Sequence, residues 1–249
     1  MLAQIEHKGK SYQLDFSKPI DISIPMYPKE DCVRAWYVPP VSIEPVRNGD
    51  WVGEIKHGGS VNFRNILFNP HGNGTHTECV GHISEEAYSI NSCLEEFMFK
   101  AQLITIHPEN IEEDTVIGLS QIKEAFTIGE NCEALVIRTT PNNKEKHHKQ
   151  YSNTNPTYLH HEAASYIRDQ GIKHLLIDQP SVDREFDEGK LLAHRAFWGY
   201  PNNTRIDATI TELIYVDEAV ADGFYLLNIQ FASFVNDASP SKPVLYAIS

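Results

Sequence analysis

The sequence predicts a single α/β domain, spanning residues 1–249, in which strands outnumber helices. Two patterns support this. Short aliphatic runs bounded by turn or charged residues recur along the chain, which is typical of buried strands. Only a few segments carry apolar residues at helical spacing. A chain of 249 residues, 41% of them hydrophobic, is long enough to bury one ample core.

The expected strands begin near the N-terminus. Residues 20–25 alternate apolar and polar side chains until a proline ends the run. Residues 51–57 and 61–68 flank Gly58-Gly59, which indicates a hairpin turn at this glycine pair. The remaining runs are short and aliphatic, and the first three of them have the character of parallel strands: residues 102–107, 133–139, 174–178, 224–234 and 243–248.

Fewer segments predict helices. Residues 158–170 follow a Pro-Thr pair, end at Gly171 and have one apolar face. Residues 120–126 and 187–198 are two further candidates, and residues 85–90 are expected to form a turn of helix. The polar stretch 141–156 is expected to be an exposed loop.

Composition and charge limit the class of partner. The formal net charge is -13, which disfavours nucleic acid and anionic membranes. No run approaches the roughly 20 apolar residues of a membrane span, and none resembles a secretory signal. The four cysteines show no pair spacing, so we expect reduced thiols. These features together predict a cytoplasmic protein that acts on a small molecule.

The segment from His71 to His82 is the strongest functional signal. It contains three histidines, one glutamate, one cysteine and three glycines within twelve residues. Imidazole and carboxylate are the usual ligands of a catalytic divalent metal. On an extended strand His76 and Glu78 would share a face, and Gly81 would let the chain turn so that His82 returns.

Two distant residues are expected to complete the site. His194 and Glu212 are each a polar group set in an apolar run, which is costly unless the group is paired or liganded. A catalytic metal also needs an open position for water or substrate. We therefore predict that these side chains meet the segment of residues 71–82.

These residues resemble the metal-dependent cyclase superfamily, which includes bacterial kynurenine formamidase and isatin hydrolase and has the signature H-x-G-T-H-x-D-x-P-x-H. Gly74-Thr75-His76 matches G-T-H, Glu78 stands at the aspartate and His82 at the last histidine. Further similar segments follow in the family's order: residues 20–23, 136–139, 177–183, His194-Arg195 and Glu212.

The chain departs from that signature in the motif itself. The first motif histidine falls at Gly72, and the nearest imidazole is His71, one place early. The aspartate is Glu78 and the proline is Val80, and residues 199–207 look like an insertion. The resemblance leaves open whether one or two ions bind.

The resemblance implies a swivelling β/β/α fold and a homo-oligomer, either a homodimer or a homotetramer. It also implies hydrolysis of an amide, formamide or lactam with Zn²⁺ or Mn²⁺. His76, Glu78 and His194 would hold the metal, with Glu212, His71 and His82 as further ligands. His82 or Glu212 would also carry the proton to the leaving nitrogen.

Other interpretations stay open. The same fold could support a cyclase or dehydratase, or a catalytically silent metal-binding protein. Cys79 is a weaker ligand candidate, since buried thiols commonly serve only packing. Residues 181–183 could shape the pocket or form a turn. Six aromatic residues could line a pocket or belong to the core: Trp36, Tyr37, Trp51, Phe63, Phe68 and Trp198. The remaining histidines are expected to play no part in the site: His7, His57, His107, His147, His148, His160, His161 and His174.

Overall fold

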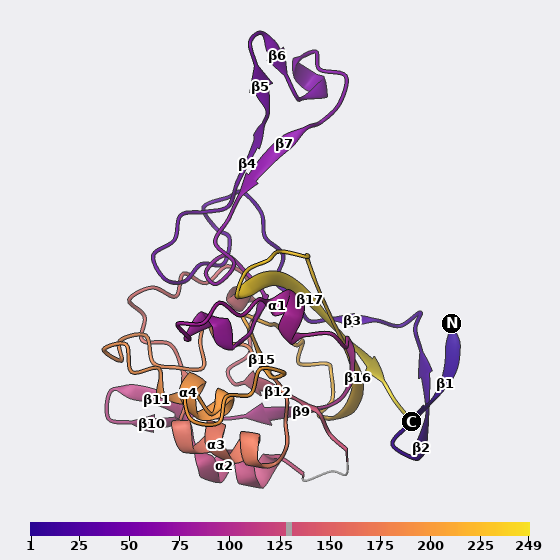
Figure 1. Cartoon of the computed structure of the whole chain (residues 1–249), viewed down its shortest axis with the longest axis vertical. Helices are drawn as coiled ribbons and strands as arrows, with labels where there is room; N and C mark the ends of the chain where they lie inside the picture. The colour runs from indigo at the N-terminus through magenta and orange to yellow at the C-terminus, as the bar shows by residue number, and fades with distance from the viewer. Residues whose placement is uncertain (128–130) are drawn as a thin grey trace.

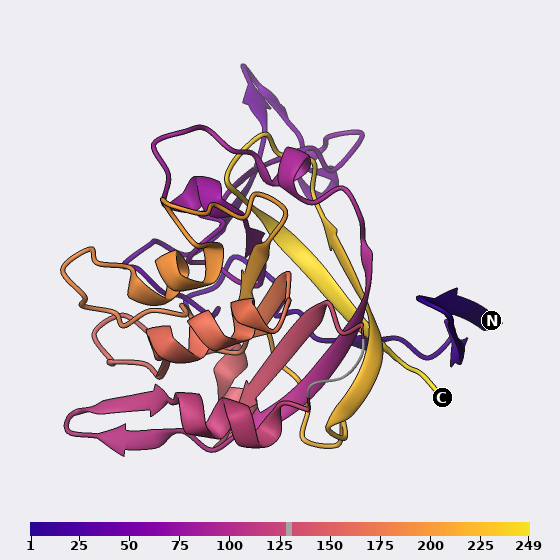
Figure 2. The same ribbon diagram turned by 60° about the horizontal axis from the view of Figure 1, so that its bottom comes forward.

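A computed structural model describes residues 1–127 and 131–249 and contains one dominant sheet of eight strands (Figures 1 and 2). Seven strands close into a barrel because the first and last of them also pair. The eighth, β3 (Ile20–Asp21), extends the sheet beside β17. In spatial order the barrel strands are β16 (Gly223–Phe231), β9 (Met98–Ile106), β12 (Ala134–Thr139), β14 (His174–Ile177), β15 (Thr209–Glu212), β8 (His76–Glu78) and β17 (Ala238–Ala247). The predicted strand-rich α/β class is confirmed.

Four neighbouring strands of the barrel, β9, β12, β14 and β15, run parallel. This confirms the parallel character predicted for residues 102–107, 133–139 and 174–178. The other three barrel strands, β8, β16 and β17, pair antiparallel with their neighbours. β8 lies between β15 and β17, so side chains of both strands lie next to those of β8.

The helices α2 (Leu119–Ala125), α3 (His161–Asp169) and α4 (Leu192–Trp198) cover one side of the sheet (Figure 2). α3 begins later than predicted because β13 (Tyr158–Leu159) pairs with β11 (Asp114–Ile117) instead of joining the helix. α4 also begins late, because the Asp187 carboxylate binds the N–H groups of Gly189 and Leu191 in a preceding turn. The turn of helix predicted for residues 85–90 is wrong, because residues 85–89 form no helix and α1 (Ile90–Cys93) begins only at Ile90.

Alternation along the strands separates two cores. Leu135 and Ile137 on β12 pack toward the helices, in one cluster with Ile167 of α3 and Phe197 of α4. Their neighbours Ala134 and Val136 belong to a second cluster that includes strands from around the barrel. Successive residues of a strand point to opposite faces, so the second cluster fills the barrel and the first lies between barrel and helices.

The predicted hairpin at Gly58-Gly59 is wrong. The strand β7 (Arg64–Leu67) pairs with β4 (Ser42–Pro45), and β6 (Trp51–Val52) pairs with β5 (Arg47–Asn48). Gly58 instead ends a short 3₁₀ helix with φ of 86°, a left-handed conformation that favours glycine. Residues 42–67 form an arm that projects from the body of the molecule (Figure 1).

Smaller strands complete the fold. β1 (Leu2–His7) and β2 (Lys10–Asp15) form an N-terminal hairpin, and β10 (Glu109–Ile111) pairs with β11. None of these strands was among those expected from the sequence. No helix within residues 1–127 and 131–249 is long and apolar enough to cross a membrane.

The prediction that residues 141–156 form an exposed loop is wrong for Lys146. This side chain is buried, and its Nζ lies 2.6 Å from Asp178 Oδ2 and 2.9 Å from the carbonyl oxygen of Thr139. Asp178 also accepts the backbone N–H of Thr139 at 2.8 Å. The ion pair therefore ties the loop to the carboxyl ends of β12 and β14.

We expect Lys146→Met to lower the free energy of unfolding by about 3–5 kcal/mol, because it leaves the Asp178 carboxylate buried without its cation. Urea unfolding followed by circular dichroism measures the change. Adding Asp178→Asn to the same chain should recover part of the loss. Equal stability of Lys146→Met and the unsubstituted protein would show that Asp178 does not depend on this ammonium group.

Candidate metal centre

Three of the predicted ligands lie on two adjacent strands. His76 and Glu78 are two residues apart on β8, so their side chains share one face of the sheet. Glu212 on β15 is directly opposite His76 in the register, and the two side chains approach to 3.4 Å between His76 Nε2 and Glu212 Oε2. All three side chains are buried.

His194 reaches the same point from α4, and Asp183 holds it there. The Asp183 carboxylate accepts the backbone N–H groups of Ala193 and His194, at 2.7 and 3.1 Å, and lies 2.6 Å from His194 Nδ1. His194 Nε2 then faces the sheet, 3.0 Å from Glu78 Oε1 and 3.7 Å from Glu212 Oε1. The segment 181–183 thus contributes to the site through Asp183.

His71 and His82 complete the cluster on its more exposed side. Their rings stack with centroids 4.3 Å apart. His71 Nδ1 lies 3.1 Å from Glu78 Oε2, and His82 Nε2 lies 3.9 Å from the same oxygen. The structure therefore brings all six predicted site residues together, from β8, β15, α4 and the segments on either side of β8.

Steric crowding explains why the imidazole stands at position 71. A Cβ built on Gly72 would lie 2.7 Å from Val38 Cγ2 and 2.9 Å from the carbonyl oxygen of Ala35. These distances are too short for a side chain to fit without moving the backbone of the neighbouring loop. The motif position therefore has to be glycine here, and His71 enters the cluster from the preceding residue.

One residue of the cluster, Asp237, was missed by the sequence analysis. Its Oδ2 lies 3.0 Å from His71 Nε2 and 3.4 Å from His82 Nδ1. Asp237 directly precedes β17, whose first residue is opposite Glu78 in the register, and its carbonyl accepts the N–H of Cys79 at 3.0 Å. A single aspartate in a polar loop carries no motif, so only the pairing of β17 with β8 reveals it.

Two buried polar atoms of the cluster without hydrogen-bond partners, called orphaned atoms below, indicate that a cation would fit there. Within the described part of the chain, the buried atoms His76 Nε2 and Glu78 Oε2 have no hydrogen-bond partner. His76 Nδ1 lies 3.0 Å from the carbonyl oxygen of Gly74, so a neutral ring that donates there presents a lone pair at Nε2. Buried polar atoms without partners are costly, and a divalent ion would satisfy both. The donor set suits such an ion.

Overlapping sets of ligand atoms surround this point. In each set the atoms lie within 4.8 Å of one another: His71, His76 and Glu78; His71, His82 and Asp237; and Glu78, His82 and His194. His71, Glu78 and His82 each belong to two of the sets, so these three residues link the sets into one cluster.

The electrostatics of the cluster follow from its burial. Although burial favours the neutral acid, the nearby rings of His82, His194 and His71 hold the pKa of Glu78 well below its usual value. Burial opposes charging of the rings, but the carboxylates of Asp237 and Glu78 raise the pKa of His71 to about 10. Asp183 and Glu78 likewise raise the pKa of His194 well above its usual value. Without an ion, His71 and His194 therefore favour the protonated form.

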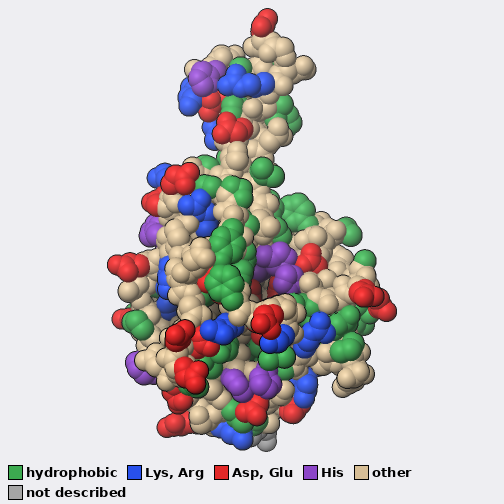
Figure 3. Space-filling model, turned by 90° about the vertical axis from the view of Figure 1, so that its left-hand side faces the viewer, with side chains coloured by type: hydrophobic (Ala, Val, Ile, Leu, Met, Phe, Trp, Pro, Cys, Tyr) green, Lys and Arg blue, Asp and Glu red, His purple; other side chains and the backbone are tan. Residues whose placement is uncertain are grey.

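A cavity of about 320 Å³ opens onto the cluster, which forms part of its wall together with Trp36, Leu191 and Arg184. Figure 3 shows histidine side chains gathered in a hollow of the body, below the arm. Of the six aromatic candidates, Trp36 alone lines this cavity. The others lie elsewhere: Trp51 and Phe63 on the arm, Tyr37 exposed, Phe68 against Phe234, and Trp198 in the core behind His194.

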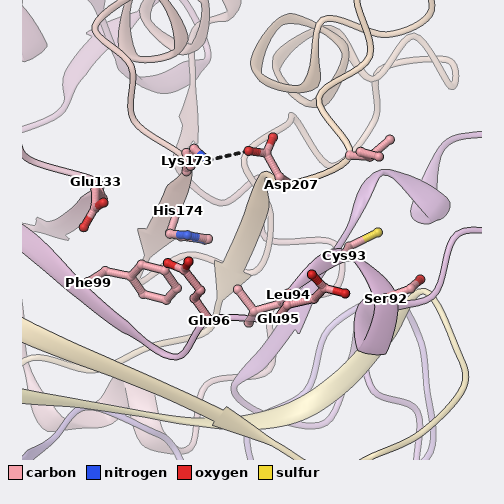
Figure 4. Close-up of a pocket in the computed structure, with 11 residues that line it drawn as sticks. Ser92, Cys93, Leu94, Glu95, Glu96, Phe99, Glu133, Lys173, His174 and Asp207 are labelled. Atoms are coloured by element: carbon pink, nitrogen blue, oxygen red, sulfur yellow. Dashed lines mark ion pairs between the residues drawn. The ribbon is translucent and has the colours of Figure 1, made fainter.

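His174, predicted to take no part in the site, lies at the amino end of β14, away from the cluster. It lines a second cavity of about 270 Å³, together with Phe99, Glu96 and Cys93 (Figure 4). Burial lowers the pKa of His174 to about 3. Cys79, the weaker ligand candidate, is buried beside Cys93, with its Sγ 3.6 Å from the carbonyl oxygen of Tyr88. The other histidines predicted to stand apart also belong to none of the ligand sets found in the described residues: His7, His57, His107, His147, His148, His160 and His161.

Comparisons with known proteins point in one direction. The Cyclase family model matches residues 14–184. Kynurenine formamidase of Bacillus cereus is 27% identical over 236 residues, covering 94% of this chain and 97% of that protein. Kynurenine formamidase of Bacillus mycoides is 25% identical, covering 96% and 99%.

Solved structures share the fold. An isatin hydrolase bound to the product analogue thioisatinate has a TM-score of 0.68 at 14% identity, covering 93% of each chain. A potential metal-dependent hydrolase with cyclase activity has a TM-score of 0.66 at 17% identity, covering 92% of this chain and 97% of that chain.

We expect the affinity for Zn²⁺ to rise with pH up to about 10, the pKa of His71. A metal binds neutral imidazole, so His71 and His194 must lose protons before binding. The affinity should rise about tenfold per pH unit for each proton released. Isothermal titration in two buffers of different ionisation enthalpy counts those protons. Binding without proton release would contradict the assigned charge of the ion-free cluster.

Proposed function

Since the chain belongs to the cyclase family, we propose that it is a metal-dependent hydrolase that cleaves the C–N bond of an amide, a formamide or a lactam. The convergence of four imidazoles and two glutamates in one cluster, of which His71, His82, His194 and Glu212 line a cavity, supports this most directly. Related proteins named kynurenine formamidase and isatin hydrolase agree with this class of reaction.

His76, Glu78 and His194 are the proposed main ligands, with Glu212, His71 and His82 completing the shell for one or two ions. When bound there, Zn²⁺ or Mn²⁺ supplies Lewis acidity toward a carbonyl and makes water a better nucleophile. Imidazole and carboxylate donors suit both metals. The protein keeps these donors oriented before any ion arrives, because the outer nitrogen of His76 faces the Gly74 carbonyl and that of His194 faces Asp183.

Two residues are proposed to move the proton to the leaving nitrogen. His82 lines the cavity and is the most exposed of the ligand-type residues. Glu212 also lines it, and its Oε1 accepts the N–H of Val182 at 2.8 Å, which fixes the carboxylate. A positioned acid or base of this kind contributes about 10²–10⁴-fold to the rate.

The cavity and the surface charge support a small-molecule substrate. The lining of the cavity combines the apolar side chains of Trp36 and Leu191 with histidines and carboxylates. A volume of about 320 Å³ is typical of small-ligand sites. The net charge of -13 makes nucleic acid and anionic membranes poor partners. We propose that the enzyme works in the cytoplasm.

A cyclase or dehydratase is the second candidate. One structural neighbour carries cyclase activity in its name, and a shared fold does not decide between reactions. A catalytically silent metal-binding protein is the third candidate, and the motif departures at Gly72, Glu78 and Val80 are its support. It would bind metal without turnover.

We expect the double variant His76→Ala/Glu78→Ala to lose most of the bound Zn²⁺ or Mn²⁺ and all measurable turnover, because both substitutions remove proposed ligands. Elemental analysis of the purified protein measures the metal. Hydrolysis of N-formylkynurenine, isatin and a simple lactam measures the activity. Glu96→Gln, in the second cavity, is the control and should change neither.

An unchanged metal content in the double variant would overturn the proposal. Full metal content in the unsubstituted protein without turnover of any C–N substrate would favour a cyclase or a silent homologue.

We also propose that the protein is a homo-oligomer and that the arm of residues 42–67 contacts a second copy. A two-stranded hairpin is only marginally stable alone. This one exposes several large apolar side chains: Ile55, Val61, Phe63, Ile66 and Leu67. The arm carries three acidic and three basic residues, so its charges balance, whereas the whole chain has a net charge of -13. Two copies can therefore meet at the arm with little electrostatic repulsion.

We expect Ile66→Ser/Leu67→Ser to shift the protein from a dimer or tetramer toward the monomer, because the substitutions remove apolar area from the proposed contact. Sedimentation velocity measures the assembly. Ile111→Ser, at an exposed position of β10, is the matched control and should leave the assembly intact. A monomeric unsubstituted protein, or an unchanged assembly in the double variant, would contradict the proposed contact.

A further inference from the structure

The two innermost imidazoles of the cluster share one arrangement. Each has its Nδ1 beside an oxygen acceptor and its Nε2 turned inward. For His76 the acceptor is the carbonyl oxygen of Gly74 at 3.0 Å, and for His194 it is the Asp183 carboxylate at 2.6 Å. Metal-binding histidines almost always donate their second N–H to a carboxylate or carbonyl, which fixes the tautomer and the ring orientation.

Asp237 provides the same arrangement for the other two rings at once. Its Oδ2 lies 3.0 Å from His71 Nε2 and 3.4 Å from His82 Nδ1. The opposite nitrogens, His71 Nδ1 and His82 Nε2, face Glu78 Oε2 at 3.1 and 3.9 Å. One carboxylate therefore stands behind two stacked imidazoles, and both present their inner nitrogens to the same buried oxygen.

We propose that Asp237 is a positioning residue of the metal centre, holding His71 with Nδ1 and His82 with Nε2 directed at the ion. This inference rests on the proposed metal-dependent function. It explains how an imidazole one place away from the family motif can serve the site. Gly72 leaves no room for a side chain, and Asp237 orients the ring that comes from His71 instead.

The alternative is that Asp237 binds the ion directly. Its carboxylate also forms a compact set with His71 and His82, but that set would use the outer nitrogens of both rings. Two observations favour the inner nitrogens. The orphaned atoms His76 Nε2 and Glu78 Oε2 lie on the inner side. The Asp237 side chain is 25% exposed, whereas that of Glu78 is fully buried. The inner position is thus the one with unmet coordination.

The tautomers of His71 and His82 in the unsubstituted, Zn²⁺-loaded protein show whether Asp237 orients these rings or binds the ion itself. Long-range ¹H–¹⁵N spectra of protein labelled at histidine show which nitrogen carries the proton. We expect the proton on Nε2 of His71 and on Nδ1 of His82. A proton on the opposite nitrogen of either ring would overturn the inference, and this measurement needs no variant.

Asp237→Asn should weaken Zn²⁺ binding by about 10–100-fold, the usual effect of removing an outer partner of a ligand histidine. Asp183→Asn, which alters the carboxylate behind His194, should act similarly. Glu96→Gln should have no effect. Competition with a chelating dye measures the affinity, and circular dichroism checks that each variant is folded.

The outcomes separate this inference from the proposed function. Absence of Zn²⁺ and Mn²⁺ binding by the unsubstituted protein would defeat both. Normal metal binding with an unchanged affinity in folded Asp237→Asn would defeat only the role of Asp237. A weakened affinity together with the expected tautomers would establish that role.

Discussion

The burial of the Glu78 carboxylate is the constraint on which the site depends. A fully buried charge is tolerated only when opposite charge and hydrogen bonds surround it. Here three imidazoles approach its two oxygens, His194 at Oε1 and His71 and His82 at Oε2. The chain has therefore gathered donors from distant segments around one acid. The same arrangement leaves Oε2 without a hydrogen bond, a deficit suited to a cation.

The three residues of β8 make this gathering possible. Pairing with β15 places Glu212 opposite His76, and pairing with β17 places Asp237 next to the partner of Glu78. α4 lies on the same side of the sheet, and its first turn delivers His194. Strand register thus places most of the ligand-type side chains. Asp183 orients the ring of His194, and the Gly74 carbonyl orients the ring of His76.

Local patterns in the sequence predicted much of this site, because a polar residue in an apolar run has few explanations other than pairing. That argument found His194 and Glu212, and the density of the motif found the residues from His71 to His82. Asp237 escaped because its role comes from the pairing of β17 with β8, which has no local signature. Lys146 was misjudged for a similar reason, since its acid partner, Asp178, lies 32 residues away. The hairpin at Gly58-Gly59 failed because the glycine pair ends a 3₁₀ helix, while the strands pair elsewhere.

The crowding around Gly72 has a consequence for how this protein is aligned with its relatives. In an alignment, the column of the first motif histidine would contain glycine here and suggest that one imidazole has been lost. The space at that column is filled by the loop bearing Ala35 and Val38, and the imidazole count is maintained from the adjacent column. Reinstating histidine at 72 would add a clash rather than a donor. A residue's role should therefore be transferred between relatives by its position in space. In this chain the alignment column of the motif histidine holds Gly72, whereas the imidazole in the cluster comes from His71.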